Sequence, residues 1–111
     1  MVSPPPLLRA RAVDYAQPDL CCCGGISEGM KIATLASLYD IHVTPHAWGS
    51  AIGQAAALHF YAARPRHPST TTLEDKLIEC GQTEKPFRTE IVRNPIRFDQ
   101  GRWFLPSEPG L

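Results

Sequence analysis

The chain has 111 residues, room for one small domain, and 43% of them are hydrophobic, enough for a packed core. The formal net charge is zero and the basic residues form no stripe, which gives no electrostatic case for nucleic acid or an anionic membrane as partner. No stretch approaches the ~20 apolar residues that cross a bilayer, and the first eight residues lack the pattern of a signal peptide. Three of the four cysteines are adjacent, which does not suit a disulfide framework, so we expect a cytoplasmic protein.

The first twenty residues predict a lead-in, a short helix and a strand. Residues 1–6 hold three consecutive prolines and are expected to be disordered, because proline lacks an amide donor and restricts the residue before it. Residues 7–12 fit the tail of a helix. Residues 13–20 then fit a strand with Pro18 near its end.

A turn and a helix are expected next. The pair Gly24-Gly25 allows a tight backbone turn, and it lacks the spacing of a dinucleotide-binding loop. Ser27 is a plausible N-cap for a helix whose apolar residues recur at helical spacing until Asp40.

The same order then repeats. Residues 41–44 predict a β-branched strand, and Ser50 is expected to cap a second helix over 51–63. A polar loop should cover 64–72, and 77–80 predict a third short strand. The last residues, 86–111, alternate extended pieces with turns at Asn94-Pro95, Gln100-Gly101 and Pro109-Gly110.

Alternating strands and helices with short links are typical of parallel βαβ units. Three polar residues follow the three expected strands: Asp19, His46 and Glu79. In a parallel α/β barrel the carboxyl ends of the strands meet on one face, where the chemistry occurs. An Asp, a His and a Glu delivered there are the parts of a proton-transfer site.

The ordered motifs resemble the mandelate racemase/muconate lactonizing enzyme family of the enolase superfamily. The resemblance covers roughly residues 7–111 and rests on V-D-Y-A-Q-P-D-L at 13–20, G-G-I-S-E at 24–28, T-P-H-A-W-G at 44–49, I-E at 78–79, Q-T at 82–83, P-F-R at 86–88 and the closing prolines. Within that family the chain looks most like acid-sugar enzymes, such as galactarate-type dehydratases and D-galactarolactone cycloisomerases.

The resemblance implies an α/β fold that is part of a (β/α)8 barrel. Residues 7–85 would supply the last three strands with their intervening helices, and 86–111 a tail that packs on a capping domain absent here. A complete barrel takes ~250 residues, so the family's magnesium ligands and its Lys-containing motif would lie on strands before residue 1. After the strand-eight Glu the family often has an apolar residue and Asp, where this chain has Cys80 and Gly81.

The resemblance also implies roles for the site residues. His46 would move the proton α to the carboxylate of a sugar acid or lactone, since an unperturbed imidazole titrates near pH ~6.5. Asp19 would orient the His46 ring, a protonated Glu79 would donate a hydrogen bond to the oxyanion, and Trp48 would line the pocket. Mg²⁺ would be the cofactor of the intact enzyme, a dehydratase, cycloisomerase or racemase that we expect to be a homo-oligomer.

For the 111-residue chain alone these expectations predict no turnover. Two other hypotheses stay open: a non-catalytic partner that docks through an open strand edge, and a truncated product without function. A zinc site is a further alternative, with Cys21, Cys23, His42 and His46 as ligands, although the usual Cys-x2-Cys spacing is absent.

Overall fold

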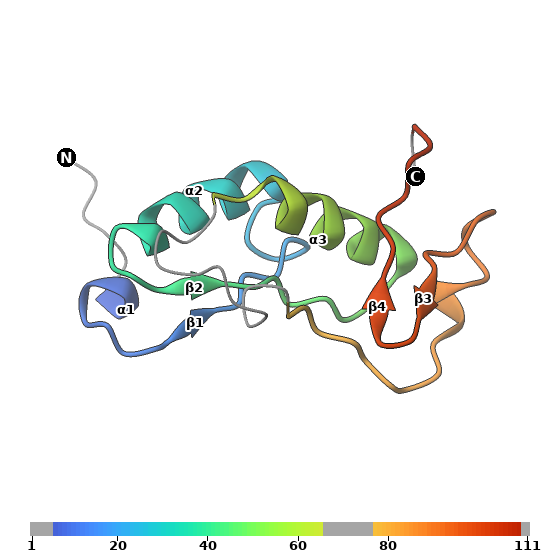
Figure 1. Ribbon diagram of the computed structural model, residues 1–111, viewed down its shortest axis with the longest axis horizontal. Helices are drawn as coiled ribbons and strands as arrows, with labels where there is room; N and C mark the ends of the chain where they lie inside the picture. Colours follow the sequence, from blue (N-terminus) through green and yellow to red (C-terminus); the bar gives the residue numbers. More distant parts are fainter. Residues whose placement is uncertain (1–5, 66–76, 110–111) are drawn as a thin grey trace.

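The computed structural model describes residues 6–65 and 77–109. Residues 1–5 of the lead-in expected at 1–6, and most of the loop expected at 64–72, therefore lie outside the described residues. Pro6, the last residue of that expected lead-in, instead begins helix α1, where a proline is tolerated in the first turn. Figure 1 shows the order of the elements, which are α1 (Pro6–Arg9), β1 (Tyr15–Ala16), α2 (Ile26–Ser37), β2 (His42–Val43), α3 (Ala51–Ala63), the 3-10 helix η2 (Pro86–Arg88), β3 (Phe98–Asp99) and β4 (Arg102–Trp103). No helix in the described ranges is long and apolar enough to span a bilayer.

Strands β1 and β2 pair in parallel, as the βαβ pattern predicts. Tyr15 lies opposite His42 and Ala16 opposite Val43, with the Tyr15 and His42 rings stacked at a centroid distance of 5.0 Å. The expected strand at 13–20 is much shorter in the structure. Pro18 has no amide hydrogen to donate to a ladder, so the regular pairing ends before it.

Helix α2 begins two residues earlier than expected. Gly25 is its N-cap, and the Gly29 amide donates to the Gly25 carbonyl at 3.0 Å, so Ser27 lies inside the first turn and caps nothing. Gly24 and Gly25 have φ of 106° and 88°, the left-handed region that glycine enters without a Cβ penalty. After the helix, Asp40 also has positive φ, at 63°, and the chain turns back toward β2.

Helix α3 begins and ends where the sequence predicts. The Ser50 hydroxyl accepts a hydrogen bond from the Gly53 amide at 3.3 Å, which satisfies one of the free amides at the start of the helix. The sequence prediction of a Ser50-capped helix over 51–63 is therefore confirmed.

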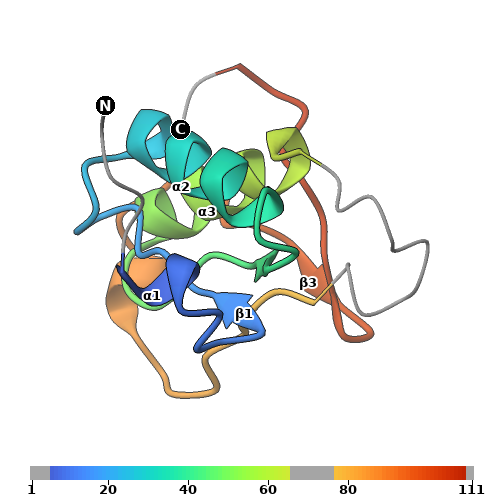
Figure 2. The same cartoon turned by 90° about the vertical axis from the view of Figure 1, so that its left-hand side faces the viewer.

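Helix α2 lies over the β1–β2 pair, and the two long helices α2 and α3 pack against each other (Figures 1 and 2). Their contact is close because Gly29 has no side chain: a Cβ there would lie 2.5 Å from Leu20 Cδ2 and 3.2 Å from a ring carbon of Phe60. Phe60 is 0% exposed and Leu20 is 5% exposed. This contact places the core directly beneath the loop that carries Asp19.

The prediction of a third strand at residues 77–80 is wrong. Residues 77–80 form no strand, and the described residues contain two separate two-stranded pairs and no closed barrel. The segment instead approaches β2 through side chains, as in the hydrogen bond that the Thr44 hydroxyl donates to the Leu77 carbonyl at 2.8 Å. The partial barrel is thus a mixed α/β unit with one parallel pair.

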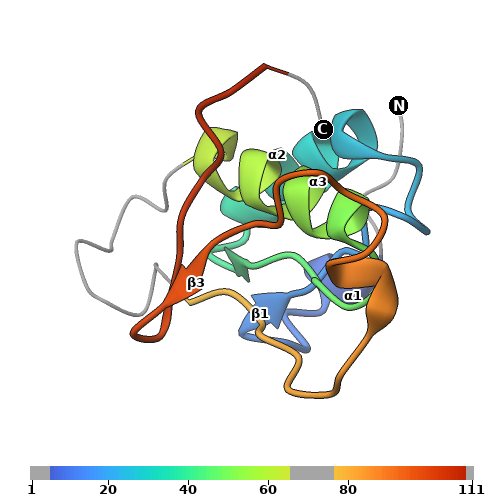
Figure 3. The same ribbon diagram turned by 90° about the vertical axis from the view of Figure 1, so that its right-hand side faces the viewer.

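The C-terminal residues form a separate hairpin (Figure 3). Strands β3 and β4 are antiparallel, with Phe98 opposite Trp103. The turn between them is made by Gln100 and Gly101, at the break the sequence predicts, with φ of 48° and 75°. Preceding the hairpin, η2 contacts α3 and brings Arg88 toward the loops that follow β2.

Candidate functional site

The structure brings His46 and Glu79 into direct contact. The His46 Nδ1 and Glu79 Oε2 atoms lie 2.5 Å apart, and the same carboxylate oxygen accepts the Ala47 amide at 3.2 Å. The two side chains are 39% and 32% exposed, so solvent and a substrate can reach them. When the carboxylate is ionised it only accepts hydrogen bonds, and Nδ1 would then be the donor.

Backbone pairing sets the position of His46. Beyond β1 and β2, Asp19 and His46 make one further parallel pairing, and the His46 amide donates to the Pro18 carbonyl at 3.1 Å. The ends of the first two expected strands therefore lie side by side. Pro45, fully buried, fixes the turn that precedes His46.

Asp19 is close to His46, but its carboxylate serves its own loop. Oδ1 accepts the Cys21 amide at 2.8 Å, and the Asp19 carbonyl accepts the amides of Cys22 and Cys23 at 3.0 and 2.7 Å. The Cys22 thiol and the Cys21 amide, with a smaller effect of His46, lower the pKa of Asp19. The same contact with Asp19 raises the pKa of the Cys22 thiol. In the described part of the chain, the ring of His46 has its hydrogen bond with Glu79 and none with Asp19.

Trp48 lies at the surface beside a lysine. Trp48 is 58% exposed, and the Lys85 ammonium lies over its indole ring. Desolvation, and then the positive charge of Arg88, lower the pKa of Lys85. No motif in the sequence marks Lys85, because a single lysine in a loop has no pattern around it.

A metal site does not form from the described residues. Over 6–65 and 77–109, no three His, Cys, Asp or Glu side chains gather into a group that could hold an ion. All four cysteines are free. The zinc alternative therefore has no support in this structure, and the residues present do not by themselves fit the magnesium site that the resemblance implies.

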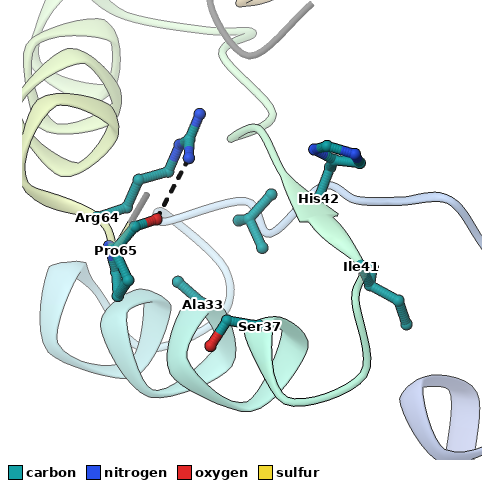
Figure 4. A pocket seen from close by; sticks show the side chains of 7 residues that line it. Ala33, Ser37, Ile41, His42, Arg64 and Pro65 are labelled. Atoms are coloured by element: carbon teal, nitrogen blue, oxygen red, sulfur yellow. Dashed lines mark hydrogen bonds between the residues drawn. The ribbon is translucent and has the colours of Figure 1, made fainter. Parts of the chain in front are cut away.

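A small pocket lies elsewhere, between α2, β2 and the end of α3 (Figure 4). His42 and Arg64 line it together with mostly apolar groups, and the Arg64 guanidinium donates to the Pro65 carbonyl at 3.4 Å. None of the four expected site residues borders it. The candidate site is therefore the open surface around the His46–Glu79 contact.

The chain is similar to several known proteins. The chain is 44% identical over 104 residues to D-galactarolactone cycloisomerase of Agrobacterium fabrum, a match that covers 94% of this chain and 28% of that protein. It is 45% identical over 107 residues to D-galactonate dehydratase of Ralstonia pickettii, covering 95% and 27%. The crystal structure of the 3,6-anhydro-D-galactonate cycloisomerase from Zobellia galactanivorans superposes with a TM-score of 0.73 at 36% identity, covering 90% of this chain and 26% of that one.

The chain thus spans about a quarter of the length of the relatives it matches. Two of these relatives are a cycloisomerase and a dehydratase by name. The family model described as "Enolase C-terminal domain-like" matches residues 5–111. The chain therefore belongs to the enolase C-terminal domain-like family, which includes the mandelate racemase and muconate lactonizing enzymes.

Proposed function

We propose that this chain carries the proton-transfer residues of a sugar-acid dehydratase or cycloisomerase. The observation that supports the proposal most directly is the 2.5 Å contact between His46 Nδ1 and Glu79 Oε2 at the ends of neighbouring chain segments. The names of the matched relatives supply the substrate class, a sugar acid or its lactone.

In the proposed mechanism each ring nitrogen of His46 has a separate role, and the contact with Glu79 supports this division. Nδ1 is held by Glu79, which leaves Nε2 as the atom that accepts a proton. In the proposed step the C–H bond α to the substrate carboxylate breaks. The proton moves to Nε2, and the electron pair moves into the carboxylate. The imidazolium that forms is stabilised by the Glu79 carboxylate, the role that a buried aspartate plays in a serine-protease triad.

This proposal changes the roles of the two carboxylates. Asp19 lies next to His46 in the backbone pairing but uses its side chain on the Cys21 amide, so it fixes the loop rather than the ring. Glu79 is proposed as the ring-orienting residue. The competing proposal is that a protonated Glu79 donates a hydrogen bond to the oxyanion. The Glu79→Gln experiment below distinguishes the two roles.

A chimera tests the function. The segment of the Agrobacterium fabrum D-galactarolactone cycloisomerase that aligns with this chain is replaced by residues 7–111, and turnover of D-galactarolactone is measured. We expect the chimera to be active, because its other segments come from a working enzyme. His46→Asn in the chimera should lower kcat by about 10²- to 10⁴-fold, the usual size of a general-base contribution.

Two variants sharpen the result. Glu79→Gln keeps a neutral hydrogen-bond donor but loses the charge that stabilises the imidazolium, so we expect a large loss of kcat if Glu79 orients His46. A nearly full rate would instead favour the oxyanion role. His59→Asn, at an exposed position on α3, is the matched control and should leave the rate unchanged. A folded His46→Asn chimera with the full rate would refute the proposal.

A further inference from the structure

Arg88 connects the two loops that carry the site. Its Nη1 donates to the Gly81 carbonyl at 2.5 Å and its Nε donates to the Gly49 carbonyl at 3.4 Å. Gly49 lies three residues after His46, and Gly81 lies two residues after Glu79. One side chain on η2 thus links the segments on both sides of the His46–Glu79 contact.

The Arg88 guanidinium fills the space next to Gly81. A Cβ at Gly81 would collide with Arg88 Nη2, so a side chain at position 81 and the guanidinium in its present place exclude each other. Nη2 is buried and has no hydrogen-bond partner among the described residues. A guanidinium is always charged and presents a rigid fork of donors, so its two carbonyl contacts fix the separation of the loops as well as joining them.

The segment at 77–81 needs such a connection. It forms no strand, so no ladder of backbone hydrogen bonds holds it beside β2. Among described residues it is joined to the β2 side by the contacts of Glu79 itself, by the Thr44–Leu77 hydrogen bond and by Arg88. Since the first of these is the active pair, its alignment depends on the other two.

We propose that Arg88 is a positioning residue, which holds the loops at 46–49 and 79–81 in the register that keeps Glu79 on the His46 ring. The inference deepens the proposed function, because it concerns the same pair. The inference can be tested without an enzyme assay. The Ala47 amide donates a hydrogen bond to the Glu79 carboxylate, so the hydrogen-exchange rate of that amide reports whether Glu79 stays in place.

The experiment measures amide hydrogen exchange by NMR in the 111-residue chain. The Arg88→Met variant should accelerate exchange at Ala47 by about tenfold, because charge-assisted hydrogen bonds to the loops are lost. The Ile41 amide, which donates to the Ala36 carbonyl in the core, serves as the internal reference and should be unaffected. Arg97→Met removes the same charge at an exposed site and is the matched control.

Two further variants keep the test decisive. Gly81→Ala displaces the guanidinium while leaving it in the chain, and should accelerate Ala47 exchange as Arg88→Met does. Arg88→Lys keeps the charge but cannot reach both carbonyls, so we expect an intermediate rate. Equal acceleration at Ala47 and Ile41, or no change at Ala47 in Arg88→Met and Gly81→Ala, would overturn the proposal. Neither result depends on whether the chimera turns over a sugar acid.

Discussion

Two regions of the molecule are held together in different ways. Every buried hydrophobic side chain of the described residues lies between Leu8 and Phe60, the region that runs from α1 to α3. No residue of 77–109 is buried. The first region is stabilised by apolar surface removed from water, whereas the second is placed by individual hydrogen bonds and ring contacts.

The candidate site joins these two regions. His46 belongs to the buried region, where the backbone pairing with Asp19 fixes its position. Glu79 belongs to the exposed region and reaches His46 through its side chain. A site built this way has one partner on a rigid scaffold and the other on a loop. Its geometry is therefore more sensitive to polar contacts than the overall fold is.

The largest expected effect is on the free energy of unfolding, and it differs between a phenylalanine in the buried region and one in the exposed region. Phe60→Ala should lower the free energy of unfolding by about 3–5 kcal/mol, because it empties a fully buried site between the two helices. Phe98→Ala should cost about 1 kcal/mol or less, since Phe98 is 45% exposed and mainly contacts Trp103. Urea unfolding followed by circular dichroism gives both values. Similar losses in the two variants would remove the distinction between the regions.

A smaller effect is expected within the buried region, at the start of α3. Ser50→Ala removes the hydroxyl that accepts the Gly53 amide and should lower the free energy of unfolding by about 1 kcal/mol. Ser50→Asp should retain most of the stability, because aspartate is also a good N-cap. If the alanine and aspartate variants were equally stable in urea, the cap would not contribute.

The smallest effect concerns the loop of Asp19, and it depends on pH. Hydrogen bonds from Cys22 and Cys21 favour the ionised carboxyl and lower its pKa in the folded chain. The resulting stabilisation is present above the ordinary carboxyl pKa and is lost as the pH falls through the lowered value.

Asp19→Asn should therefore be slightly less stable than the natural chain near pH ~6, with the difference disappearing in strong acid, below the ordinary carboxyl pKa of ~3.9. Urea unfolding of both proteins over this pH range gives the comparison. Because all other carboxyls titrate in both, their difference isolates Asp19. Parallel curves, with no change in the difference, would contradict the assigned cause.

Local signals in the sequence account for the helices. The Ser50 cap and the nearly continuous apolar residues after it predict α3 with its observed bounds, because capping and local composition act within a few residues. The start of α2 was less well predicted. Both Gly25 and Ser27 can cap a helix, and only the folded backbone shows that the glycine does. The parallel β1–β2 pair follows from the alternation of elements.

The third strand could not be predicted correctly from residues 77–80 alone. Their apolar pattern suits a strand, but a strand exists only where another backbone pairs with it, and the described neighbours supply side-chain contacts instead. For the same reason the sequence places Asp19, His46 and Glu79 at one edge of the fold but does not decide which carboxylate contacts the imidazole.

The sequence by itself determined the family, the helix α3 and the parallel order of β1 and β2, since each depends on local pattern or on motifs read in order. Only the tertiary structure decided that Glu79 contacts His46, that Asp19 fixes its own loop, and that Arg88 links the two site loops. The contacts of His46 with Glu79 and of Arg88 with Gly49 join residues that are 33 and 39 positions apart. Every hydrogen bond, near or distant, also depends on ångström-scale distance and direction, which no spacing in the sequence records.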